Sequence, residues 1–113
     1  MATTEQLRSG IGTYLQGHLM PKLDGTRQFL LGTAYGMAAG RMDDVLCQLG
    51  QHPAARALGA VKENGEVDLD AVYTAAYNQM KTQGKLRLNV PMIGEFVFDE
   101  TDLQELYQCI KAQ

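Results

Sequence analysis

Apolar residues recur three or four positions apart through the first half of the chain, and this spacing predicts amphipathic helices. The first helix is expected over residues 3–20, because Pro21 and the Asp24-Gly25 pair mark a turn. The second is expected over 26–49, followed by Gly50 at the position of a C-terminal cap. A short helix over 54–58 follows. The apolar residues of the two long helices are Leu7, Ile11, Tyr14, Leu15 and Leu19, then Phe29, Leu30, Leu31, Tyr35, Met37, Met42, Val45, Leu46 and Leu49.

A polar turn at residues 63–66 separates this half from the next helix, which Asp68 is placed to cap. That helix is expected to reach about Gln83 and to stop at Gly84. A terminal helix is expected to begin after Asp99, which is again a suitable N-terminal cap. The apolar stripes of these two helices are Leu69, Val72, Tyr73, Ala76 and Met80, and Leu103, Leu106, Tyr107 and Ile110.

Between these helices the apolar period changes from that of a helix to that of a strand. Leu86, Leu88 and Val90 alternate with polar residues, and Phe96 and Phe98 alternate around Val97. Two short strands with one apolar face each are therefore predicted, joined by a loop at 91–94.

These elements predict an α+β fold in which an N-terminal helical pair packs on an α-β-β-α unit with a two-stranded antiparallel hairpin. A chain of 113 residues has the usual size of one domain, so residues 1–113 are expected to form a single domain. Its subregions are a helical part over 3–60 and the α-β-β-α part over 61–113. Hydrophobic residues make up 45% of the chain, which is typical of proteins that fold around a core.

The charge distribution argues against nucleic acid as a partner. The net charge is -3, and from Lys62 onward there are nine acidic and five basic residues. Binding through phosphate groups needs a concentrated basic face. The alternative is a nucleic-acid-binding regulator in which the first two helices form a helix-turn-helix. Its contacts would be Arg8, Lys22, Arg27, Arg41 and Arg56.

Cys47 and Cys109 form no C-x-x-C motif, and the N-terminus lacks the pattern of a secretory signal. Both thiols are therefore expected to be reduced, in a cytoplasmic protein. The longest nearly uncharged stretch, residues 28–40, is shorter than the roughly 20 residues that span a bilayer as a helix. No membrane span is predicted.

Three glycines, Gly32, Gly36 and Gly40, recur every four residues within the second predicted helix. Each costs about 1 kcal/mol relative to alanine inside a helix, so a packing gain is expected in return. One interpretation is close packing within the chain, against the first helix or the hairpin. The other is a surface for self-association or partner docking, for which Tyr35 and Ala39 complete the candidate set.

The sequence predicts no catalytic residue, no metal site and no cofactor. His18 and His52 lie 34 residues apart, without cysteine or acidic residues at the spacing of a zinc site. The carboxylates Asp68 and Asp70, and the cluster of Asp99, Glu100 and Asp102, stand where helices begin, so helix capping accounts for them. A small enzyme remains a third possibility, one that a concave pocket with Asp68, Asp70 or His18 would favour.

Four segments, made of turns, caps and core positions, are distinctive when they are read together: Met20-Pro21-Lys22-Leu23, Leu31-Gly32-Thr33-Ala34, Asn89-Val90-Pro91-Met92-Ile93-Gly94 and Phe98-Asp99-x-x-Asp102-Leu103. With these segments the chain resembles small uncharacterised proteins encoded in phages and prophages of Gram-positive bacteria. The resemblance implies an accessory or structural role in phage assembly, and hence a virion-associated location, or a role in an element carried by the host genome. It carries no catalytic residue. We expect a non-catalytic interaction or assembly module that binds itself or another protein.

Overall fold

A computed structural model describes residues 2–113, except for the side chains of residues 54, 55 and 58. It has the predicted α+β fold, with helices followed by a two-stranded antiparallel hairpin and a terminal helix. The elements in chain order are α1 (Thr4–Tyr14), α2 (Gly25–Gly40), α3 (Met42–Gln51), α4 (Pro53–Leu58), α5 (Leu69–Gln83), β1 (Leu86–Val90), β2 (Gly94–Phe98) and α6 (Glu100–Lys111).

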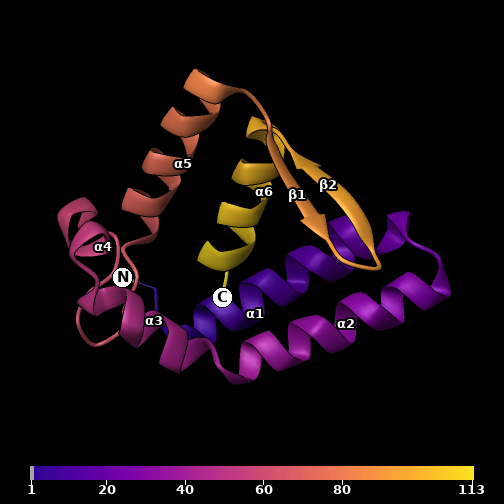
Figure 1. The fold of residues 1–113 in the computed structure, drawn as a ribbon, viewed down its shortest axis with the longest axis horizontal. Coiled ribbons are helices and arrows are strands. Elements are labelled where there is room, and N and C mark those ends of the chain that lie inside the picture. Colours follow the sequence, from indigo (N-terminus) through magenta and orange to yellow (C-terminus); the bar gives the residue numbers. More distant parts are fainter. Residues whose placement is uncertain (1) are drawn as a thin grey trace.

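Helices α1, α2 and α3 form a base on which α5, α6 and the hairpin stand (Figure 1). Helix α6 packs along α1, α5 packs on α6, and β2 leads directly into α6. The N-terminal helical pair therefore supports the α-β-β-α unit, as the sequence predicts.

The first helix changes its winding along its length. A capping box joins Thr3 and Gln6 at its start, where each side chain accepts a hydrogen bond from the other residue's backbone N–H. The α-helix ends at Tyr14 and continues as one π-helical turn, Leu15–Leu19, and one 3₁₀ turn, Met20–Lys22. Proline in that last turn stops the helix, because its ring blocks continuation of the hydrogen-bond ladder.

The single helix predicted over 26–49 is wrong, because it breaks at Arg41 into α2 and α3. Arg41 leaves the helical region, with φ -106° and ψ 4°. Two properties of the sequence favour the break. Gly40 has a low helix propensity, and Asp43 and Asp44 stabilise a new helix N-terminus through the helix dipole. The short helix predicted over 54–58 is present as α4.

The segment between α4 and α5 is tied to the beginning of the chain. Ala2 and Val67 form an antiparallel bridge, with N···O distances of 2.7 and 3.0 Å in its two hydrogen bonds. The predicted turn at 63–66 is closed by the backbone N–H of Lys62, which donates to the carbonyl of Glu66 at 2.8 Å. Gly65 has a φ of +88°, which glycine adopts without steric cost.

The hairpin pairs Leu86 with Phe98 and Val90 with Gly94, which confirms the predicted strands. Helices α5 and α6 begin at the predicted caps: Asp68 accepts from the N–H of Ala71, and Asp99 accepts from that of Asp102.

The core consists of two hydrophobic clusters, and Leu106 of α6 packs against both. Ile93, which the sequence places in the hairpin loop, is buried in the second cluster and anchors the hairpin to the base. The buried members of the clusters are Ala2, Leu7, Val67 and Ile110 in the first, and Tyr14, Leu19, Leu31 and Ile93 in the second.

Part of the expected apolar surface is not covered. Leu86 and Leu88 are 53% and 51% exposed, although Phe96 and Phe98 on the same face of the hairpin are partly buried. On α5, Met80 is buried but Val72 is exposed. The faces are as predicted, but the chain is too small to cover all of them.

Gly10 lies where α1 and α6 approach most closely. A Cβ atom added there would stand 2.9 Å from the backbone nitrogen of Ile110 and 2.7 Å from its Cγ1. We predict that Gly10→Ala lowers the free energy of unfolding by about 2 kcal/mol, because α1 and α6 must separate. Gly17→Ala is the matched control: apart from the adjoining turns of the helix, no residue in the described part of the chain lies within 4 Å of a Cβ at Gly17, so this change should be neutral or stabilise by about 0.5 kcal/mol. Urea unfolding measures both, and equal effects would contradict this interpretation of the contact.

Tyr14 is the largest fully buried side chain, and its hydroxyl has no hydrogen-bond partner among the described residues. Burial, together with the negative charges of Asp102 and Glu105, raises the pKa of Tyr14 to about 12. Because the folded-state pKa lies above the ordinary value of 10.0, the resulting stabilisation is complete below pH 10 and is lost as the pH rises towards 12.

We predict that Tyr14→Phe leaves the free energy of unfolding unchanged or raises it by up to about 1 kcal/mol at pH 7, because it removes an unsatisfied hydroxyl. Between pH 10 and 12 the wild type should lose more stability than the variant. Urea unfolding at a series of pH values measures both effects. A loss of stability in the variant at pH 7 would contradict the prediction.

Candidate interaction surface on α2

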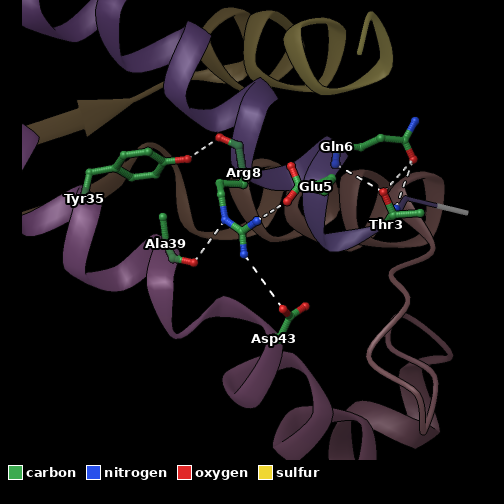
Figure 2. A network of polar contacts seen from close by, with 7 residues as sticks. All are labelled: Thr3, Glu5, Gln6, Arg8, Tyr35, Ala39 and Asp43. Atoms are coloured by element: carbon green, nitrogen blue, oxygen red, sulfur yellow. Dashed lines mark hydrogen bonds and ion pairs between the residues drawn. The ribbon is translucent and has the colours of Figure 1, made fainter.

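Helix α2 is held against α1 by a polar network around Arg8 (Figure 2). The Arg8 Nε donates to the carbonyl of Ala39 at 3.1 Å, and its guanidinium also pairs with Glu5 and, at 3.9 Å, with Asp43. The Tyr35 hydroxyl donates to the carbonyl of Arg8, and burial raises the pKa of Tyr35. One side of α2 is therefore fixed towards α1.

The start of α2 is fixed in the same orientation. Asp24 accepts a hydrogen bond from the N–H of Arg27 at 2.8 Å, which caps the helix. The Gln28 Nε2 donates to the carbonyls of Met20 and Leu23, at 2.9 and 3.2 Å. These contacts fix which side of α2 faces the rest of the described chain.

The outer face of α2 is apolar and uncharged. Phe29 and Met37 are 72% and 69% exposed, and apart from the adjoining turns of the helix no described residue lies within 4 Å of a Cβ placed at Gly36 or Gly40. Residues three or four apart share a helix face, so these four residues and the exposed Thr33 form one stripe, which we call the α2 face. It carries two large apolar side chains beside two glycines, with no charge between residues 28 and 40.

The structure distributes the five predicted association residues over two sides of α2. Gly36 and Gly40 lie on the α2 face, and Gly32 lies beside Met20, whose Cε would be 3.6 Å from an added Cβ. Tyr35 and Ala39 point towards α1, where they contact Arg8. No other described part of the chain fills the space at Gly36 and Gly40, so the structure does not support packing of the hairpin or first helix into that part of the groove.

Sequence reasoning missed Phe29 and Met37 as surface residues, since the periodicity places them among the apolar residues of a core helix. The sequence does contain a signal of this exposure, because apolar side chains occur on both sides of α2. Leu31 is buried, while Phe29, two residues before it, is exposed. A helix that is apolar on opposite sides needs a packing partner on each side, and the described residues cover only the side of Leu31.

The charges at the two ends of α2 are of opposite sign. Lys22 and Arg27 outnumber Asp24 near its first residue, and Asp43 and Asp44 outnumber Arg41 near its last. The helix dipole adds partial positive charge at the start and partial negative charge at the end.

The residues of the nucleic-acid alternative are partly used within the chain. Arg8 is bound in the network of Figure 2, and Arg56 pairs with Glu63. Lys22, Arg27 and Arg41 are exposed, but Arg41 lies at the opposite end of α2 from the other two.

The residues considered for a small enzyme separate into two places. Asp68 and Asp70 border a cavity of about 260 Å³ near the end of α6, where Asp68 caps α5 and Asp70 accepts a hydrogen bond from Tyr107. His18 lies elsewhere, stacked on Tyr14 and 3.0 Å from a carboxylate oxygen of Glu105. Within residues 2–113, no group of three or more His, Cys, Asp or Glu side chains has the arrangement of a metal site.

None of the helices in the described part of the chain is long and apolar enough to cross a membrane. A scan against protein-family models and searches of curated proteins and of solved structures give no match to this chain. The resemblance to phage-encoded proteins stays a prediction.

A substitution at Tyr35 tests whether the polar network around Arg8 fixes the orientation of α2 on α1. We predict that Tyr35→Phe lowers the free energy of unfolding by about 1 kcal/mol, because it removes the hydrogen bond to the Arg8 carbonyl. Amide hydrogen exchange in α2 should accelerate more than in α6. Tyr77→Phe is the control, since the Tyr77 hydroxyl forms no hydrogen bond with a described residue. Equal effects of the two substitutions would show that the network does not hold α2.

Proposed function

We propose that the protein is a non-catalytic assembly module that associates with a second copy of itself through the α2 face. The observation that carries the proposal is the exposure of Phe29 and Met37 beside Gly36 and Gly40 on one uncharged helix side. Burial of these side chains from water favours association, at about 25 cal/mol per Å² of apolar area.

The α2 face is complementary to a second copy of itself. Two large side chains and two glycines lie within three helical turns, so the large side chains of one copy fit against the glycines of the other. Glycines at such a position let two helix backbones approach closely. A symmetric pair of this kind uses the same surface patch in both copies.

The charges favour an antiparallel pair of α2 helices. In that orientation the positive start of one helix, with Lys22 and Arg27, meets the negative end of the other, with Asp43 and Asp44. The helix dipoles also oppose each other favourably. A parallel pair would bring charges of the same sign together at both ends.

Solution mass by light scattering, measured over a range of concentrations, tests the proposal. The wild type should form a dimer, and Met37→Glu should be a folded monomer with a dissociation constant raised at least about tenfold. Met92→Glu is the matched control, because Met92 is 84% exposed in the hairpin turn and is not part of the α2 face.

Filling the groove gives a second, independent comparison. Gly36→Leu should weaken the dimer, while Gly17→Leu, at a position equally open within the chain, should not. Circular dichroism establishes that each variant is folded. A monomeric wild type, or a dimer that Met37→Glu leaves intact, would exclude association through the α2 face.

A further inference from the structure

A second apolar surface lies on the other side of the molecule, between α5 and the start of β1. It is a groove of about 540 Å³, within the range of sites that hold ligands. Buried Met80 and Ala60 lie at its base, and the exposed side chains of Val72 and Leu86 stand along its sides. The residues that line it are Ala60, Val72, Ala75, Ala76, Gln79, Met80, Gln83, Gly84, Lys85, Leu86 and Arg87.

The hairpin borders this groove with the edge of a strand. Leu86 and Arg87, the first two residues of β1, both line the groove, although neighbouring residues of a strand point to opposite faces. The start of the free edge of β1 therefore faces the groove, and in Figure 1 β1 is the strand of the hairpin nearer to α5. Within the described chain β1 pairs only with β2, so alternate backbone N–H and C=O groups on its other edge are free to pair with an added strand.

The charged residues that line the groove have one sign. Among the described residues of its lining, Lys85 and Arg87 are charged and none is a carboxylate, although acidic residues predominate in this half of the chain. One terminal nitrogen of the Arg87 guanidinium donates a hydrogen bond to a carboxylate oxygen of Glu95 at 2.8 Å, and the guanidinium has further N–H donors. Lys85 forms no salt bridge with a described residue and acts on Asp99 only through its charge.

We propose that this groove binds an extended segment of a partner protein in which apolar residues alternate with acidic ones. The segment adds to the free edge of β1 as a further strand. Its apolar side chains enter the groove between Leu86 and Val72, and its carboxylates lie beside Lys85 and Arg87. This site is separate from the α2 face, so the inference does not depend on self-association.

Two other occupants fit the groove less well. A small amphipathic molecule needs most of its surface buried, but the sides of this groove are exposed to solvent. A second copy of β1 would bring Lys85 and Arg87 of both copies to one edge, where like charges repel. An acidic extended segment satisfies the backbone, the apolar side chains and the cations together.

The test uses a fluorescent peptide of about eight residues with alternating valine and glutamate, a length that matches a strand. Fluorescence anisotropy with the full chain should show saturable binding. A peptide with lysine in place of glutamate should bind at least about tenfold more weakly. A third peptide, with N-methyl groups on the alternate amides that face β1, should also lose binding, because it cannot donate hydrogen bonds to a strand edge.

Paired variants on α5 locate the site. Ala75→Trp places a large side chain in the groove and should weaken binding at least about tenfold. Thr74→Trp, an exposed neighbour outside the lining, should leave binding unchanged. The proposal is overturned if no peptide binds, if the N-methylated peptide binds as well as its parent, or if Ala75→Trp and Thr74→Trp have equal effects. Displacement of the peptide by sodium laurate but not by unlabelled peptide would assign the groove to an amphipathic small molecule instead.

Discussion

The close packing of α6 on α1 is the interaction on which the rest of the structure depends. Gly10 lets the backbone of α1 approach Ile110, and the cluster that contains Ile110 also includes Ala2 and Val67. Helix α6 in turn carries β2 and supports α5. The N-terminal segment, the linker before α5, the hairpin and α5 are therefore all positioned by one helix pair, so a change at Gly10 reaches each of them.

This arrangement buries or partly buries the apolar stripes of α1 and α6, whereas the outer elements keep large apolar side chains exposed. Helix α2 contacts α1 through Tyr35 and Ala39, and its Phe29 and Met37 remain in solvent. Helix α5 buries Met80 but leaves Val72 exposed. A domain of this size has too little chain to cover both sides of its outer helices, and the uncovered sides are where partners gain most from binding.

The sequence predicts local structure well because local structure depends on neighbouring residues. The caps at Asp68 and Asp99 and the two strands follow from short patterns. What covers a face is not a local property. Periodicity assigns Leu86 and Leu88 to the same face as Phe96. It does not show that the core reaches Phe96 but leaves the two leucines of β1 exposed. Likewise, Ile93 becomes a core residue through its packing with Leu19 and Leu31, which lie far from it in the sequence.

The two open surfaces differ in the partner that their chemistry selects. The α2 face has no charge along its length and opposite charges at its ends, so a reversed copy of itself is complementary to it. The groove beside β1 has cations and no carboxylate in its lining, so a second copy is repelled and an acidic segment is attracted. A surface that matches itself produces a symmetric pair, whereas a surface that repels itself remains open in each copy of that pair. Self-association through α2 would thus place two peptide grooves on one dimer. A partner with two acidic segments would then bind the second groove at a raised effective concentration once its first segment is bound.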